Sequence, residues 1–254
     1  MNEDGFYIGY HPSAPPAHAR RLRGVSIGLV VIGLILAAGL ASQQVPFVPA
    51  VFEVGTEREW TGWLREEPVP ILVVALPGEG DHPFALSSYL LVGSGKHGAR
   101  DAVEGLHGQL ARVRGTLIHL DGQTMIELTS DGAIAALDTA EDGPIARREA
   151  IGRVTLQGEI VDSKCHFGVM NPATGKVHRA CAARCLSGGI PPVFLVRGED
   201  GGRLHLLLTG ADGRSIGRDV LDWVAEPIEV TGHVERIDSL LVLRAEPDTF
   251  SRVP

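Results

Sequence analysis

The feature that most restricts this chain is an apolar stretch from Val25 to Ala41, which is seventeen residues long and free of charge. A helix needs ~20 mostly apolar residues, with a lower limit of ~17, to cross the ~30 Å hydrocarbon core of a bilayer. The sequence therefore predicts a transmembrane helix over residues 24–45. A cleaved signal peptide is the alternative, because Gly39 and Ala41 fit a small-residue cleavage site, although the apolar region of a signal peptide is usually only ~7–15 residues long.

Charges on the two sides of this stretch predict its orientation. Three arginines, Arg20, Arg21 and Arg23, directly precede it, and the nearest charge after it is at Glu53. Positively charged flanks stay in the cytoplasm. We therefore expect residues 1–23 to form a cytoplasmic tail and the bulk of the chain to be extracytoplasmic, at a bacterial inner (cell) membrane. The net charge of −8 argues against a nucleic-acid partner.

The rest of the chain is built from short apolar runs rich in Val, Ile, Leu and Thr, which are separated by Gly, Pro and Asp. Runs of this kind are typical of β-strands. Examples are residues 71–76, 110–120, 192–197, 203–209 and 228–237. Helices are expected in only three short stretches, at residues 99–106, 176–186 and 218–225. The sequence thus predicts a mainly β protein.

An internal repeat divides this β-rich part. The segment RVRGTLI around Gly115 matches EVTGHVE around Gly232, and each runs on into a turn that contains Asp. Upstream of them, Gly62 matches Gly158. In OB-type barrels a glycine allows the long first strand to bend around the barrel.

The repeat predicts two tandem OB-like β-barrels after the transmembrane helix. The first is expected over residues 50–140 and the second over residues 150–254, with a polar linker at 138–150. A two-sheet sandwich is the alternative architecture. The distance between the paired glycines is 53 residues in the first half and 74 in the second, and most of the extra length lies in residues 163–189. A small barrel does not need this insert to close, so it is the best candidate for a functional segment.

All three cysteines of the chain lie in this insert. Its second half, rich in Ala and Arg, is expected to be helical, which would place His178, Cys181 and Cys185 on one helix face. Thiolates and imidazole form a tetrahedral set of soft ligands, suited to Zn, Fe or Cu. The predicted ligands are Cys165, His178, Cys181 and Cys185, with Asp162 and His166 as further candidates.

A disulfide is the main alternative to a metal, because cysteines outside the cytoplasm usually pair. Cys181 and Cys185 on one helix are poorly placed to bridge each other. A bridge would therefore join Cys165 to one of them and leave one thiol over. The insert also contains four basic residues and no acid, a charge that would favour thiolates, balance a metal site or hold an anion.

The string from Gly93 to Gly98, GSGKHG, invites comparison with a phosphate-binding loop. It lacks the first glycine of that motif, and His97 occupies the position of the metal-binding Ser or Thr. We interpret it as a glycine-rich turn between strands.

The segments GEIVDSKC (158–165), HRAC (178–181) with Cys185, and GGIPP (188–192) resemble uncharacterised bacterial single-pass envelope proteins with OB-like β modules. The resemblance covers about 35 residues and implies the same layout of one anchor and β modules. It supplies no reaction.

We therefore expect a membrane-anchored accessory protein or subunit of a membrane complex, an electron-transfer complex being one option, with a Cys/His metal or redox site. A structural scaffold subunit with a disulfide-stapled insert is one alternative, and a thiol-dependent enzyme is another. A non-enzymatic role is favoured, because no HExxH, GxSxG or paired-carboxylate pattern stands out.

Overall fold

The computed structural model describes residues 15–43, 49–77, 84–129, 132–138 and 143–253. The chain divides into two compact units, Met1–Phe47 and Val48–Pro254. All strands of the described part lie in the second unit. Most of the tail expected over residues 1–23, and the end of the helix expected at 44–45, lie outside the described residues.

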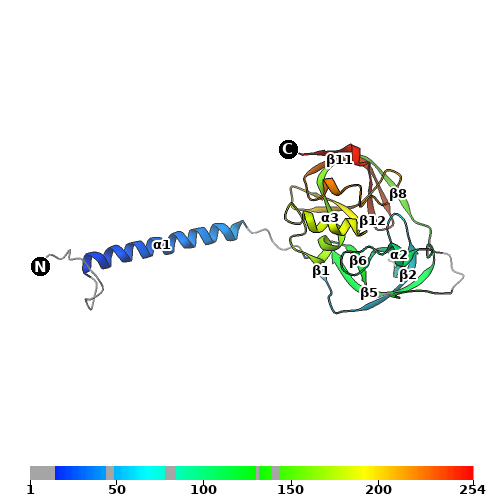
Figure 1. The fold of residues 1–254 in the computed structure, drawn as a ribbon, viewed down its shortest axis with the longest axis horizontal. Helices are drawn as coiled ribbons and strands as arrows, with labels where there is room; N and C mark the ends of the chain where they lie inside the picture. Colours follow the sequence, from blue (N-terminus) through cyan, green and yellow to red (C-terminus); the bar gives the residue numbers. More distant parts are fainter. Residues whose placement is uncertain (1–14, 44–48, 78–83, 130–131, 139–142, 254) are drawn as a thin grey trace. The chain divides into compact units, whose positions relative to one another are not determined.

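The described part of the first unit is one long helix, α1, Pro16–Ser42 (Figure 1). It is 27 residues long, its most apolar window has a mean hydropathy of 2.5, and none of that window is buried. At 1.5 Å per residue its length is about 40 Å, enough to cross a bilayer. The helix begins at Pro16 rather than at residue 24, because proline is well suited to a first helical turn and good helix formers follow it. Such a helix fits an anchor or a signal segment.

The second unit begins with a five-stranded barrel. Its strands are β2 (Arg58–Arg65), β3 (Ile71–Pro77), β4 (Phe84–Val92), β5 (Leu110–Leu120) and β6 (Gln123–Leu128). They pair in the order β5-β2-β3-β4-β6, and a further pairing of β5 with β6 closes the barrel. The pairing of β4 with β6 is parallel and the others are antiparallel. Two short strands, β1 (Val51–Phe52) and β7 (Ile134–Ala136), add to β5, and the short helix α2 (Arg100–Val103) lies between β4 and β5.

The second barrel repeats this topology strand for strand. Its strands are β8 (Arg148–Asp162), β9 (Pro192–Arg197), β10 (Arg203–Thr209), β11 (Ile228–Ile237) and β12 (Leu240–Arg244). They pair in the order β12-β10-β9-β8-β11, β11 closes on β12, and the β10–β12 pairing is parallel. The strand β13 (Phe250–Arg252) extends β11. Two single turns of 3₁₀ helix, η2 (Leu221–Trp223) and η3 (Pro247–Thr249), complete the second barrel. Two closed five-stranded barrels of equal topology confirm the predicted tandem OB-like fold.

The matched glycines of the first strands explain how these strands bend. A Cβ atom at Gly62 would lie 2.4 Å from the carbonyl oxygen of Val73, and one at Gly158 would lie 2.4 Å from that of Leu195. Both distances are far below van der Waals contact, so only glycine allows the first strand to approach the second so closely.

The two barrels share a hydrophobic core besides their own interiors. Along β3, Val73 faces the shared core and Leu72 faces the interior of the first barrel. Along β9, Leu195 faces the shared core and Phe194 the interior of the second barrel. Strands buried on both faces have continuous apolar runs instead of an alternating pattern, which explains the sequences ILVVAL and PVFLVR.

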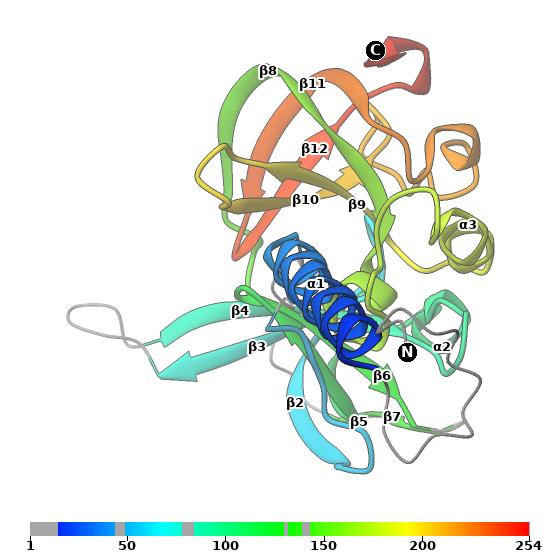
Figure 2. The ribbon, with the colours of Figure 1, turned by 90° about the vertical axis from the view of Figure 1, so that its left-hand side faces the viewer.

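The linker expected at 138–150 is partly strand, because β8 begins at Arg148. The first residues of β8 pair with the end of β11, and the register of this pairing shifts next to Glu235. The exposed Arg148 forms an ion pair with Glu235. Charged residues are compatible with a strand that faces solvent. The insert at 163–189 connects β8 to β9, and its helix α3 (Arg179–Ser187) lies on the same side of the second unit as α2 (Figure 2).

Candidate functional site

The insert first turns back on itself directly after β8. Residues Cys165–Val169 form a single wide helical turn, η1, and the backbone amide of Cys165 donates to Asp162 Oδ1 over 2.9 Å. The chain then crosses to α3, for which His178 is the N-cap residue. The helix begins three residues later than the sequence predicts, after the turn around Gly175.

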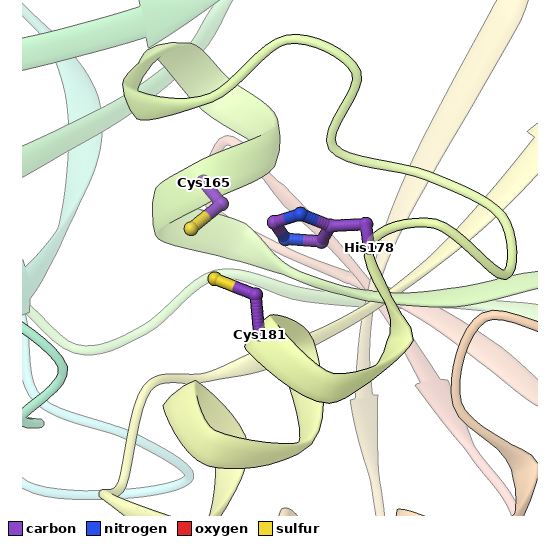
Figure 3. Close-up of side chains that lie close together, drawn as sticks. All are labelled: Cys165, His178 and Cys181. Atoms are coloured by element: carbon purple, nitrogen blue, oxygen red, sulfur yellow. The ribbon is translucent and has the colours of Figure 1, made fainter.

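These segments bring the four predicted ligands together. Ligand atoms of Cys165, His178 and Cys181 lie within 4.8 Å of one another, and so do those of Asp162, Cys165 and Cys185. In Figure 3 the sulfur atoms of Cys165 and Cys181 point toward each other, and the imidazole ring of His178 lies beside them. Cys165 belongs to both groups, so one ion could reach ligands from each. We call these five residues the thiol cluster.

The cluster is enclosed and its cysteines are free thiols. Cys165, Cys185 and His178 are 4%, 1% and 3% exposed, and Cys181 is half-buried. The Sγ atoms of Cys165 and Cys185 are 3.9 Å apart, well beyond the ~2.05 Å of a disulfide bond. All three cysteines are unbonded, so the structure contains the thiol form of the site.

Asp162 orients the histidine of the cluster. Its Oδ2 atom lies 3.0 Å from Nε2 of His178, and the carboxyl group is fully buried. Burial acts to raise the pKa of Asp162, but the hydrogen bonds from His178 and from the Cys165 amide outweigh it, and the net pKa is lowered. An ionised Asp162 fixes the proton of His178 on Nε2, which leaves the lone pair of Nδ1 available to a metal or a thiol.

A lysine from the first barrel completes the cluster, and sequence reasoning missed it. Nζ of Lys96 lies 2.7 Å from Sγ of Cys181 and 3.6 Å from Sγ of Cys185. The hydrogen bond to Cys181 raises the pKa of Lys96 in spite of partial burial. The pKa of Cys185 is lowered to about 7 by the hydrogen bond from Cys165, with Lys96 contributing, whereas the same bond and burial raise the pKa of Cys165.

The glycine-rich string from Gly93 to Gly98 carries Lys96 to the thiols. It is a turn after β4, as predicted, and it packs directly against the end of α3. The amide of Gly98 donates to the carbonyl of Gly188 over 2.8 Å, and a Cβ atom at Gly188 would lie 1.9 Å from the carbonyl oxygen of Lys96. The glycines therefore allow two backbone segments from different barrels to touch.

Lys164 holds this turn in place. Its charge, counted with the other basic residues of the insert, had predicted a direct effect on the thiols, a metal or an anion. Its Nζ atom donates to the carbonyls of Gly93 and Gly95 over 2.8 and 2.7 Å and pairs with Glu127 over 2.8 Å. Another basic residue of the insert, Arg179, pairs with Glu226. The cation at the thiols is thus Lys96, and Lys164 acts on them only by positioning the Lys96 turn.

The structure places His166 outside the thiol cluster. Its Nε2 atom lies 3.1 Å from Nε2 of His205, on β10, and both rings are buried. Burial lowers the pKa of His166 to about 3 and that of His205 to about 4, so both are neutral at physiological pH. His166 and Cys165 are neighbours in sequence, but their side chains leave the wide turn in different directions.

No protein-family model matches the chain, and no curated protein matches it. The chemistry of the site therefore follows from its geometry. Three thiols, an oriented imidazole and one ammonium group converge in a buried space, an arrangement suited to a soft metal ion or to thiol chemistry.

Proposed function

We propose that the protein is a membrane-anchored accessory subunit of a membrane complex and that its thiol cluster binds one thiophilic metal ion, Zn, Fe or Cu. The observation that carries the metal proposal is the convergence of Cys165, Cys181, Cys185 and His178. Cys₃His is a common ligand set of structural zinc sites, and its thiolates also suit Cu(I) and iron.

Two further contacts support a metal site. Asp162 accepts a hydrogen bond from the ring of His178, as carboxylates do behind metal-binding histidines. Three thiolates around a divalent ion leave one net negative charge and the ionised Asp162 adds another, and Lys96 offsets part of this charge.

The cellular role is inferred from the layout of the chain. The apolar helix α1 would anchor the protein in the inner membrane, with its N-terminus in the cytoplasm and both barrels outside it. Barrels of this topology commonly present binding surfaces, which supports a place among other subunits, those of an electron-transfer complex being one option. Affinity purification from detergent-solubilised membranes, followed by mass spectrometry, tests this role. A chain recovered reproducibly without any partner would contradict it.

Elemental analysis of the full-length protein tests the metal site directly. Protein that is purified anaerobically in detergent should contain about one equivalent of Zn, Fe or Cu per chain. The Cys181→Ser and His178→Gln variants should lose most of it, while His233→Gln, at an exposed position on β11, should keep it. Circular dichroism would establish that each variant is folded.

The metal proposal fails if the wild-type protein is metal-free and cannot be loaded with Zn²⁺ or Cu(I). A quantitative disulfide between Cys165 and Cys185, detected by mass spectrometry in the same preparation, would instead support the structural scaffold alternative.

The contact between Asp162 and His178 favours one second candidate, a thiol-dependent enzyme. A nucleophile, a histidine base and an orienting carboxylate recur in enzymes that use an activated cysteine. This candidate requires one thiol of the metal-free protein to react much faster than the others at neutral pH, and His178→Gln to slow it. Equal, slow labelling of all three thiols would exclude it.

A further inference from the structure

A basic cleft opens beside the thiol cluster, where the two barrels meet. It has a volume of about 520 Å³ and is lined by Lys96, His97, Arg184, Ser187, Gly188 and Arg218. The first two residues come from the glycine-rich turn of the first barrel, and the next three from the end of α3. The cleft therefore exists only because the two barrels are packed together.

The charge of the cleft is unusual for this chain. Three of its lining residues are cations and none is acidic, although the chain as a whole has a net charge of −8. A neighbouring cleft that also contains Arg218 carries the carboxyl groups of Asp101 and Asp219. The cleft beside Lys96 is thus lined by cations without an acidic residue, and Lys96 shares its charge with the thiols.

The arginines of the cleft are also free of ion pairs with the described residues. Most arginines of the two barrels pair with a carboxylate, for example Arg179 with Glu226. Arg184 and Arg218 form no such pair within the described part of the chain. Only Arg147 and Arg153 share this property elsewhere in the described part of the barrels; all four arginines are exposed, and Arg147 and Arg153 lie outside the cleft.

We propose that this cleft binds a small tetrahedral oxyanion group, a phosphate or a sulfate. Guanidinium groups match the geometry of such oxygens and donate paired, charge-assisted hydrogen bonds to them. Lys96 supplies a third cation from the glycine-rich turn of the first barrel. Because Lys96 Nζ is also 2.7 Å from Cys181 Sγ, the anion would lie one side chain away from the thiols.

Isothermal titration calorimetry on the full-length protein in a zwitterionic detergent tests this proposal. The probes are inorganic phosphate, inorganic sulfate and a short-chain phosphatidylglycerol below its critical micelle concentration, each at an ionic strength held constant with chloride. We expect saturable binding of at least one probe. Binding of the inorganic ions assigns the cleft to free oxyanions, and binding of the lipid alone assigns it to a phospholipid headgroup.

Two double variants with the same change of charge make the test specific. The loss of two arginine contacts in Arg184→Gln/Arg218→Gln should weaken binding at least about tenfold. The matched control, Arg147→Gln/Arg153→Gln, should bind as the wild type does. No saturable binding of any probe, or equal weakening in both double variants, would overturn the proposal.

The outcome is separable from that of the metal site. Neither Arg184 nor Arg218 belongs to the thiol cluster, so metal content measured on the same preparations should be unchanged in both double variants. Anion binding by a metal-free protein would leave this inference standing while the metal proposal fails.

Discussion

The residue that most changes the chemistry of the site is Lys96, because it is the only cation bonded to the thiols among the described residues. Its ammonium group lies 2.7 Å from Cys181 Sγ and contributes to the lowered pKa of Cys185. Removing that charge should therefore make thiolate formation harder.

The Lys96→Met variant tests this effect in metal-free protein. The lowered pKa of Cys185, about 7, results first from the Cys165 hydrogen bond and then in part from Lys96. Thiol is the main form below that pH and thiolate above it, so loss of the cation should move the midpoint to higher pH. Ultraviolet thiolate absorbance during a pH titration measures it. The control is Lys176→Met, an exposed lysine of the same insert, and identical titrations of all three proteins would refute the role of Lys96.

Asp162 should matter to metal binding although it need not touch the metal. Its carboxylate orients His178, and loss of such a partner typically lowers metal affinity about 10–100-fold. We expect this loss in Asp162→Asn, which keeps an oxygen to accept from the Cys165 amide. Competition with a chromophoric chelator gives the affinity. Asp248→Asn, at an exposed turn, should leave the metal affinity unchanged. A similar loss of affinity in this variant would mean that Asp162 acts through the overall charge of the protein and not by orienting His178.

At the scale of elements, the sequence predicts the strands well and the site only in part. The bounds of β5, β9, β10 and β11 equal those of the apolar runs, because both strand length and turn residues are local properties. The longer distance from Gly158 to Gly232 also predicts the insert, and the clustering of three cysteines in it predicts the site. Lys96 could not be found in this way, because it reaches the thiols only through the packing of one barrel on the other.

One signal in the sequence could have drawn attention to Lys96. The chain has three lysines and twenty arginines, and two of these lysines, Lys96 and Lys164, lie at or near the site. A related turn occurs in the second barrel, where Gly210 bonds to Arg214 as Gly93 bonds to His97. That turn has no lysine. Both barrels therefore contain this turn, and Lys96 alone gives the turn of the first barrel a role at the site.

Because β8 bends at Gly158, adding one methyl group at this position should destabilise the fold. In Gly158→Ala, the new Cβ atom would lie 2.4 Å from the Leu195 carbonyl oxygen, and relieving such overpacking typically costs about 1–3 kcal/mol. Urea unfolding followed by circular dichroism should show a reduced free energy of unfolding. Gly28→Ala, with no neighbouring atom within 4 Å, is the control. A variant as stable as the wild type would mean that β8 does not need its glycine.

At the scale of the whole molecule, the shared core joins the two barrels in one compact unit. Met125 of the first barrel and Leu195 of the second belong to the same buried cluster, and Arg65 of the first pairs with Asp238 of the second over 2.5 Å. The contact of Lys96 with the thiol cluster and the basic cleft both depend on this junction, because Lys96 and His97 come from the first barrel and the other groups from the second. A barrel expressed alone would expose the apolar surface of the shared core to water.

The two barrels should therefore unfold together. Trp60 and Trp63 report on the first barrel and Trp223 on the second, so single-barrel tryptophan variants allow each to be followed by fluorescence. We expect the same denaturation midpoint for both, and Met125→Ala should lower both midpoints equally, since truncation of a buried methionine costs about 2–5 kcal/mol. Two separate transitions, or a Met125→Ala effect confined to the first barrel, would show that the barrels fold independently. In that case the positions of Lys96 and the thiols would no longer be fixed by a common core.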